Sequence, residues 1–361
     1  MLTAAMRDLQ WRKRRFAIAI IGTGLVFAMT LVLTGLANGF RVEATHTVDS
    51  LQVDAFLVKS GATGPFLGSA AFPATALKPP GVSSAAPLVY GNTASLTYGS
   101  AAPLVYGSAT MPDGDSARSV NVFGAPEGGP GIPVLTDGRT PSATNEVAVS
   151  DRMGERIGDT VEIGSLPLKI VGVVDDSTAL GGQSNIFLTT AGAQKLLFSG
   201  QSLITSMGLR GTPGDLPDGF RIVDRAGAID DLLRALSGAR QAMTLMAGLL
   251  WVVAALIVGS MIYMSALERT RDFAVFKAVG VPTRSILAGL ATQAVIVAVL
   301  AALLGGILSV LLGPLFPMRV DIPRIAFLLL PVVAITIGVL ASLAGLRRAV
   351  TVDPALAFGG P

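Results

Sequence analysis

The sequence predicts an α-helical membrane protein with four transmembrane helices, one plus three, and a large α+β extracytoplasmic domain inserted between the first and the second helix. Two observations lead to this prediction. Four apolar stretches are each longer than the roughly 20 residues that a helix needs to cross a bilayer. About two hundred more polar residues separate the first stretch from the other three. The predicted transmembrane helices cover residues 16–40, 240–267, 285–318 and 325–346.

The composition agrees with a membrane protein. The chain has 361 residues, of which 51% are hydrophobic and 14% are charged. Average soluble domains carry about 25% charged residues. The chain contains no cysteine, which excludes disulfides, thiolate metal sites and a cysteine nucleophile. The net charge of +3 comes from basic residues that flank the apolar stretches, so we expect no nucleic-acid partner.

Basic residues gather before the first span, in the loop of residues 268–284 and in the tail of residues 347–361. Because positive residues favour the cytoplasmic side, we expect both termini in the cytoplasm and residues 41–239 outside it. The expected location is the bacterial cytoplasmic membrane. A cleaved signal peptide is the alternative for residues 16–40, but this uncharged run exceeds the about 7–15 residues of a signal-peptide core.

The first residues carry apolar side chains at helical spacing next to basic ones. These apolar residues are Leu2, Ala5, Met6 and Leu9. The pattern predicts that residues 1–15 form an amphipathic helix on the cytoplasmic membrane surface. Small residues spaced four apart, at Gly35 and Gly39 and from Gly305 onward, predict tight helix packing.

The third span is expected to end early. Gly313 and Pro314 lie well inside its uncharged run, and Pro317 follows them. Proline lacks the backbone N–H that a helix interior needs, so the helix is expected to stop before residue 318.

The sequence of the extracytoplasmic domain predicts a mixture of strands and helices. The expected strands cover residues 53–58, 146–149, 161–163, 168–174 and 185–189. A short helix is expected over residues 151–157, and a second helix is expected to start at a Thr190 cap and run to Phe198.

A segment rich in glycine, proline, alanine and serine, residues 61–114, contains a near-repeat of residues 85–91 at residues 101–107. Two copies are too few for a solenoid, so we interpret them as a duplication inside a loop or hairpin. Three tyrosines, Tyr90, Tyr98 and Tyr106, lie in this segment. We expect these tyrosines to pack on an edge strand rather than to form a ligand-binding aromatic face.

An amphipathic helix is expected before the second span. Its apolar face is Ile229, Leu232, Leu233 and Leu236, and its opposite face is Asp230, Asp231 and Arg234. We expect this helix to run unbroken into the second span as a stalk.

The loop of residues 268–284 gives the most specific signal. Phe273, Phe276 and Val279 recur on one side of a short helix, and Gly280 follows as a C-cap would. Such an amphipathic helix, lying along the membrane, suits docking into a groove of a partner.

At this point the chain resembles the FtsX-like permeases, the membrane subunits of MacB-type (type VII) ABC transporters. Residues 268–280 read ERTRDFAVFKAVG, where the family has approximately ERxREIGILKALG. The outer domain carries the family's GDTVxIG, VGVV and IFLTT segments, and residues 353–357 read DPALA. Asp272, Phe273 and Ala274 stand where the family more often has Glu, Ile and Gly.

The resemblance implies a homodimer that works with two copies of a separate ATPase subunit, which would bind ATP and Mg. The loop would be the coupling helix that docks on the ATPase. The implied ATPase-coupling residues are Glu268, Arg269, Arg271, Phe273, Phe276, Lys277, Val279 and Gly280. The machine would use ATP to move its outer domain, a mode called mechanotransmission, and so export or extract an amphiphilic or peptide substrate, with an extracytoplasmic adaptor as a further partner.

Two other functions stay open at this stage. One is a transmembrane regulator of an extracytoplasmic partner, such as a cell-wall hydrolase, that transports nothing. The less favoured one is a solute importer. A catalytic role is not expected, because the chain has no P-loop motif and only one histidine, His46, with no metal-ligand spacing around it. We therefore expect a non-catalytic subunit without a cofactor or metal of its own.

Overall fold

The computed structural model describes residues 13–74, 100–113, 116–210, 216, 218–268, 275, 279–316 and 318–350. The chain forms two compact units. The helical unit comprises Met1–Gly39 and Ala239–Pro361, and the sheet unit comprises Phe40–Gly238. Residues 1–12 of the predicted N-terminal amphipathic helix lie outside the described residues, and residues 13–15 begin the first long helix.

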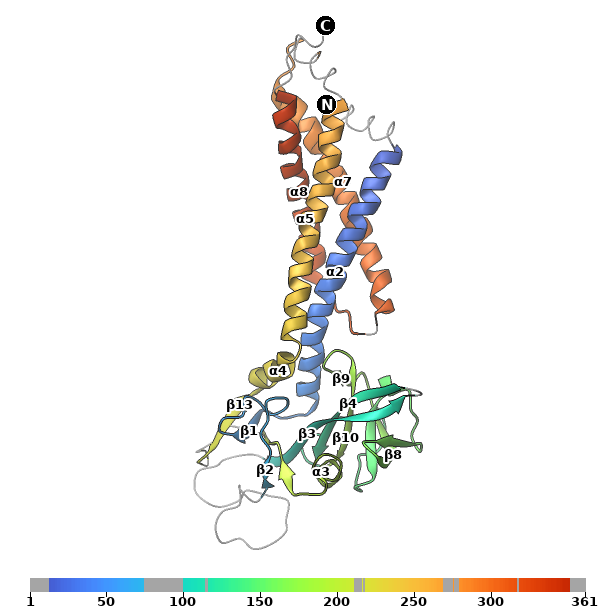
Figure 1. Ribbon diagram of the computed structural model, residues 1–361, viewed down its shortest axis with the longest axis vertical. Helices are drawn as coiled ribbons and strands as arrows, with labels where there is room; N and C mark the ends of the chain where they lie inside the picture. The colour runs from blue at the N-terminus through green and yellow to red at the C-terminus, as the bar shows by residue number, and fades with distance from the viewer. Residues whose placement is uncertain are drawn as a thin grey trace. The chain divides into compact units, whose positions relative to one another are not determined.

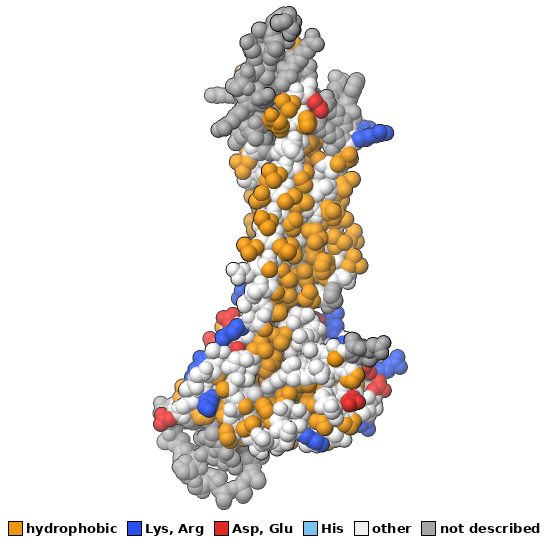
Figure 2. Space-filling model, viewed as in Figure 1, with side chains coloured by type: hydrophobic (Ala, Val, Ile, Leu, Met, Phe, Trp, Pro, Cys, Tyr) orange, Lys and Arg blue, Asp and Glu red, His pale blue; other side chains and the backbone are white. Residues whose placement is uncertain are grey.

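Long apolar helices make up the described part of the helical unit and run alongside one another (Figure 1). They are α2 (Lys13–Ser50), α5 (Ser237–Glu268), α7 (Thr283–Leu312) and α8 (Arg324–Val350). Each contributes to one apolar core, through Phe27 of α2, Ala254 of α5, Ala298 of α7 and Leu330 of α8. Large apolar side chains also cover the outside of these helices (Figure 2). An apolar outside and an apolar core are what helices in lipid require.

Among the described residues, three stretches are long and apolar enough to cross a membrane: Phe16–Ser50, Ser237–Ser265 and Ala291–Leu315. A shorter apolar helical stretch follows at Arg324–Ile337. The architecture therefore combines at least three candidate spans with an α+β unit. The expected count of four spans stays a prediction.

Helices α2 and α7 approach each other closely where glycines meet. A Cβ atom on Gly305 would lie 2.7 Å from the Cβ of Phe27 and 2.8 Å from the carbonyl oxygen of Gly24. The small residue is therefore required for this crossing, which confirms the expected tight packing at Gly305.

The other small-residue pair, Gly35 and Gly39, packs against a loop and not against a helix. The Asp321 N–H donates to the Gly35 carbonyl at 3.0 Å. A Cβ atom on Gly39 would lie 2.0 Å from the Arg319 carbonyl oxygen. The interpretation of this pair as a helix-packing motif was therefore wrong, because the chain between α7 and α8 occupies the space. The early end of the third span is confirmed, since α7 stops at Leu312 and a 3-10 turn, η3 (Gly313–Leu315), follows.

The sheet unit is built on an 11-stranded mixed sheet with the strand order β13-β1-β12-β3-β4-β10-β6-β8-β5, to which β7 and β9 add at β8 and β10. Strands β3 and β4 form its long antiparallel hairpin, with Val105 opposite Gly124. Strand β10 runs parallel to β4, and β6 runs parallel to β8. Strands β2 and β11 form a separate pair. Helix α3 (Thr190–Phe198) packs against β3 and β4.

The strands have the following bounds: β1 Ala55–Lys59, β2 Phe72–Pro73, β3 Ser100–Asp113, β4 Ser116–Ala125, β5 Asp137–Gly138, β6 Glu146–Ser150, β7 Thr160–Ile163, β8 Leu166–Val174, β9 Thr178–Ala179, β10 Gln183–Thr189, β11 Leu203–Ile204, β12 Ser206–Arg210 and β13 Phe220–Asp224. All five strands expected from the sequence are present, within two residues of their expected starts. Valine, isoleucine and leucine from several of these strands form the main core of the unit.

Two helix predictions need small corrections. The cap of α3 is Thr189, one residue earlier than expected, and its hydroxyl accepts the Gly192 N–H. The helix expected over residues 151–157 is only a 3-10 turn, η2 (Asp151–Met153), because Gly154 follows with φ +79° and ends it.

The predicted unbroken stalk is also wrong. Helix α4 (Arg225–Arg234) ends before α5 begins at Ser237. Asp231, expected on the polar outer face, is fully buried, because a distant loop supplies partners for its carboxylate.

The first copy of the tyrosine-bearing repeat, residues 85–91, lies outside the described residues, as do Tyr90 and Tyr98. The second copy, residues 101–107, lies in β3. Strand β3 has neighbours on both sides in the sheet, β12 and β4, so Tyr106 does not lie on an edge strand as expected.

Candidate functional site

Two helical segments of the sheet unit, residues 40–50 of α2 and helix α4, are each held by a buried carboxylate, and these contacts form the first candidate site. Helix α2 carries Glu43, whose side chain is almost completely buried. The two carboxylate oxygens of Glu43 accept the N–H groups of Gly181 and Gly182 at 3.0 and 2.9 Å. A buried carboxylate needs such partners, because burial without hydrogen bonds is costly.

The turn that holds Glu43 connects β9 to β10. Leu180, Gly181 and Gly182 have φ values of +55°, +84° and +93°, so the backbone stays left-handed through the turn. Consecutive N–H groups in turn conformations can point to the same side and hold an anion. The turn requires the two glycines, because a φ near +90° strains the backbone of other residues.

One turn further along α2, Thr47 is fully buried and holds the same region. Its hydroxyl donates to the Thr178 carbonyl at 2.8 Å and accepts from the Asn185 side chain at 3.2 Å. We call these contacts of Glu43 and Thr47 the α2 anchor. The Asn185 side chain in turn accepts from Asn121 of β4 at 3.1 Å, so polar contacts extend from α2 into the sheet.

Helix α4 has an anchor of its own, through Asp231. One carboxylate oxygen accepts the Phe66 N–H at 2.8 Å, and the other accepts the Gly68 N–H at 3.0 Å. A Cβ atom on Gly64 would lie 2.1 Å from the Asp231 carboxyl carbon, so the loop closes on the carboxylate only because this residue is glycine. We call these contacts the α4 anchor.

The α4 anchor leads into an aromatic cluster of Phe56, Phe66, Tyr106, Phe123 and Phe187. The ring centroids of Phe66 and Tyr106 lie 5.2 Å apart, and those of Tyr106 and Phe123 lie 5.1 Å apart. The Tyr106 hydroxyl donates to the Asn121 side chain at 3.4 Å. Burial, with the nearby Asp231 carboxylate, raises the pKa of Tyr106 well above its ordinary value, so its hydroxyl stays a donor. Tyr106 therefore contacts Phe66 of the α4 anchor and Asn121, which reaches Thr47 of the α2 anchor through Asn185.

Two further contacts fix the start of α4. The Asp224 side chain accepts the Gly227 N–H at 2.8 Å and so caps the helix. Arg225 forms an ion pair with Asp49, near the end of α2. Both of these side chains are about half exposed, so the ion pair is a weak link compared with the buried anchors.

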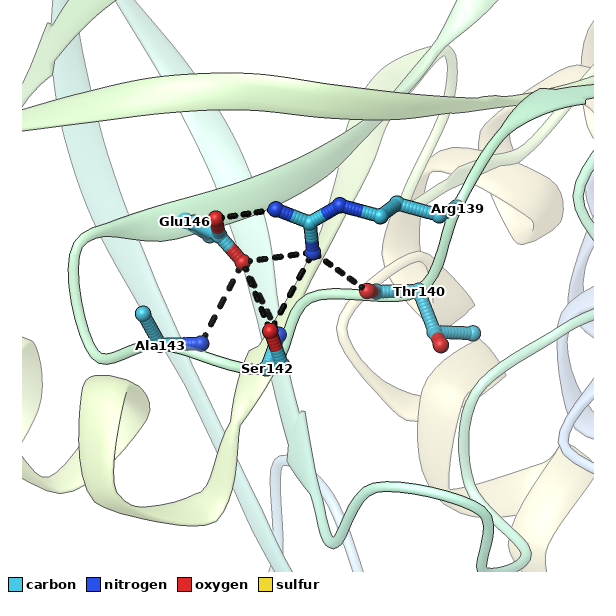
Figure 3. A network of polar contacts seen from close by, with 5 residues as sticks. All are labelled: Arg139, Thr140, Ser142, Ala143 and Glu146. Carbon is cyan, nitrogen blue, oxygen red and sulfur yellow. Dashed lines mark hydrogen bonds and ion pairs between the residues drawn. The ribbon is translucent and has the colours of Figure 1, made fainter.

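A polar network outside the anchors lies at the start of β6 (Figure 3). Arg139 pairs with both carboxylate oxygens of Glu146, and the Ser142 and Ala143 N–H groups donate to one of them at 3.0 and 3.2 Å. The hydrogen bonds from Arg139, followed by those from the backbone, lower the pKa of Glu146 to about 2. This network ties the turn to the sheet.

The described residues contain no group of three or more His, Cys, Asp or Glu side chains that could hold a metal ion. The single histidine, His46, lies exposed on α2 between the two residues of the α2 anchor.

The second candidate site is the predicted ATPase-coupling segment between α5 and α7. Glu268 is the exposed last residue of α5. Val279 is 79% exposed, and its N–H donates to the Val275 carbonyl at 3.0 Å, which makes one helical turn. Gly280 has φ +88°, the left-handed conformation of a glycine that ends a helix. Arg269, Arg271, Phe273, Phe276 and Lys277 lie outside the described residues.

Sequence reasoning missed one residue of this site. Val275 is 46% exposed and precedes Val279 by four positions, so both valines lie on one side of the turn. The i, i+4 spacing was visible in the sequence, but the two phenylalanines drew the interpretation to a neighbouring part of the helix surface. Asp231 and Glu43 were missed as well, and no local pattern signals their distant partners.

Comparisons with known proteins agree with the architecture. A family described as FtsX-like permease C-terminal matches residues 244–354, and one described as MacB-like periplasmic core domain matches residues 16–220. An uncharacterized ABC transporter permease of Mycobacterium tuberculosis is 60% identical over the whole length of both chains.

Weaker matches cover parts of the chain. The macrolide export ATP-binding/permease protein MacB 2 of Aeromonas hydrophila is 26% identical over 55% of this chain and 34% of its own length. The extracellular domain of the transporter YknZ from Gram-positive bacteria aligns over 35% of this chain and 82% of its own, with 13% identity and a TM-score of 0.28. From the family matches and the full-length relative, the chain belongs to the FtsX-like permeases with a MacB-like periplasmic core domain, the membrane permeases of ABC transporters.

Proposed function

We propose that this permease couples ATP hydrolysis by a separate ATPase subunit to motion of its sheet unit on the outer side of the membrane. Residues 268–284 dock on the ATPase. The observation that carries this proposal is the pair of exposed valines, Val275 and Val279, on one helical turn that ends at Gly280 between two apolar helices. Exposed apolar residues on a short helix are typical of helix-in-groove recognition.

The proposed topology has four spans, with both termini and residues 268–284 in the cytoplasm of a bacterium. Helix α8 supports the fourth span, because its 27 residues are long enough to cross a bilayer at about 1.5 Å per residue. Lys13 and Arg14 are exposed at the start of α2, where basic residues favour the cytoplasmic side. Two copies of the chain work with two ATPase copies, which bind ATP and Mg.

The substrate that we propose is an amphiphile or a peptide, which the complex exports or extracts on the outer side. The MacB proteins that match this chain are named for macrolide export, which supports this class of substrate. An extracytoplasmic adaptor is a further proposed partner.

The experiment that tests this function compares two equally exposed valines. Val279→Asp places a charge in the proposed docking surface, and Val134→Asp makes the same change at a 75% exposed residue of the sheet unit. The tagged chain is purified in mild detergent with the ATPase expressed alongside it, and the bound ATPase and its activity are quantified. We expect Val279→Asp to lower the amount of bound ATPase at least about tenfold, as loss of about 1.4 kcal/mol would do. The Val134→Asp control should keep both the bound ATPase and its activity. Equal ATPase binding by the two variants would contradict the docking role.

A further inference from the structure

Helix α4 belongs to the sheet unit and is not continuous with α5. It ends at Arg234, and α5 begins at Ser237. Two local hydrogen bonds lie at the short connection: the Leu236 N–H donates to the Leu233 carbonyl at 3.1 Å, and the Ser237 hydroxyl donates to the Arg234 carbonyl at 2.8 Å. A helix of 10 residues is marginal by itself, so the position of α4 depends on its side-chain contacts.

Among those contacts, Asp231 fixes direction as well as distance. Ala228, Leu232 and Leu233 are buried on α4, but apolar burial is not directional and permits sliding. The Asp231 carboxylate instead accepts two N–H groups of one loop, each with a different oxygen. Because one planar carboxylate accepts both hydrogen bonds, they fix both the position and the orientation of the loop relative to α4.

The same loop enters the core of the sheet unit through Phe66. Its N–H donates to Asp231, while its ring lies 5.4 Å from Phe56, 5.2 Å from Tyr106 and 5.9 Å from Phe123, centroid to centroid. Because close-packed rings cannot move independently, a displacement of the Phe66 backbone displaces the aromatic cluster.

We propose that Asp231 is the positioning residue that makes α4 and residues 63–69 move as one body. Motion that arrives through α5 then reaches the aromatic cluster through the Asp231 carboxylate. The part of this inference that concerns ATP-driven motion rests on the proposed function, whereas the joining of α4 to the loop does not.

The first test measures hydrogen exchange of the full chain in detergent without nucleotide. Asp231→Asn keeps the shape of the side chain but turns a hydrogen-bond donor toward one of the two N–H groups. We expect the Phe66 and Gly68 amides to exchange at least about tenfold faster in this variant. The matched control is Asp230→Asn, the same change at the exposed neighbouring residue, which should leave both amides unchanged.

The second test adds the ATPase and measures distances between spin labels. Because the chain has no cysteine, Leu67→Cys and Arg234→Cys provide a clean label pair at exposed positions of the loop and of α4. Labelled chains are diluted into unlabelled ones so that only the distance within one chain is read. With Asp231 intact, we expect one narrow distance that is the same without nucleotide and with nucleotide trapped. With Asp231→Asn, trapping nucleotide should change or broaden it, while the Asp230→Asn control keeps the single distance.

The two proposals can fail separately. If Asp231→Asn behaves like Asp230→Asn in exchange and in distance, the inference about Asp231 is overturned, whatever the ATPase does. If the distance between His46→Cys labels on two copies of the chain does not change when nucleotide is trapped, the proposed function fails, but the exchange result still decides whether α4 and the loop are one body.

A measurement on the unmodified chain covers the case in which Asp231→Asn does not fold. The Phe66 and Gly68 amides should then open at the same rate as the amides of α4, because one cooperative unit opens together. Exchange of these two amides ahead of α4 would overturn the inference.

Discussion

The two helical segments of the sheet unit that carry the anchors use the same chemistry in different settings. In both, a buried carboxylate accepts two backbone N–H groups: Glu43 those of Gly181 and Gly182, and Asp231 those of Phe66 and Gly68. Glu43 lies within one unbroken helix, α2, of 38 residues. Asp231 lies on a short helix that is separated from the next one along the chain.

The difference teaches which contacts each helix needs. Helix α2 has a second buried contact, Thr47, and its anchor continues as a polar network through Asn185 and Asn121. Helix α4 has Asp231 as its buried polar contact, and its anchor continues as packed rings. Loss of a polar link is therefore expected to be partly compensated at α2, whereas Asp231 is the one polar side chain among the buried residues of α4.

The largest effect is expected from Phe66→Ala, which removes the ring that connects the α4 anchor to the aromatic cluster. A buried phenylalanine replaced by alanine leaves a cavity and costs about 3–5 kcal/mol of unfolding free energy. Leu67→Ala is the matched control, since Leu67 is 43% exposed and adjacent in the chain. Denaturant unfolding of the full chain, followed by near-ultraviolet circular dichroism, measures both. Similar losses in the two variants would show that the ring does not hold the anchor.

A smaller effect is expected from Glu43→Gln. The amide offers one acceptor oxygen, so one of the two glycine N–H groups loses its partner, which costs about 1–3 kcal/mol of unfolding free energy. Because Thr47 still holds α2, the exchange of amides near Asn185 should rise less than that of Phe66 does in Asp231→Asn. Glu127→Gln, the same change at an exposed site, is the control for denaturant unfolding and hydrogen exchange. A larger disturbance from Glu43→Gln than from Asp231→Asn would reverse the comparison.

The smallest effect is expected at Glu146, which accepts several hydrogen bonds but lies near the surface. Its pKa is about 2 in the folded chain and ordinarily about 4.5, so it stabilises the fold fully above pH 4.5 and loses this contribution as pH falls toward 2. Glu146→Gln should lower the melting temperature by about 1–2 °C at pH 7 and by less as the pH falls below 4.5. Thermal melts between pH 7 and pH 2 measure this; a difference between variant and parent that does not change with pH would contradict the assignment.

Much of the fold follows from local patterns. Short apolar runs between turn residues predicted β6, β7, β8 and β10, and the glycine at 280 predicted the turn that follows Val279. These predictions succeed because each depends on neighbouring residues, whose spacing fixes the exposed and buried faces.

The anchors could not be predicted, because their partners are distant in the chain. Asp231 accepts from Phe66, 165 positions away, and periodicity placed this aspartate with Asp230 on the polar face. The two residues between α4 and α5, Ala235 and Leu236, are neither proline nor glycine, so the sequence does not mark the helix break. Tertiary contacts decide both the burial of Asp231 and the helix break, and the local residue pattern carries no information on such contacts.

The most direct test of the central claim uses one label on α2. His46→Cys lies on the exposed face beside the α2 anchor, and a single spin label reports distances only between two copies of the chain. The permease is reconstituted with its ATPase, and the distance is measured without nucleotide and with nucleotide trapped. We predict a distance between two copies that changes when nucleotide is trapped, and that stops changing in Val279→Asp. A distance that stays the same in both states, in a complex that hydrolyses ATP, would contradict the claim that ATP hydrolysis moves the sheet unit.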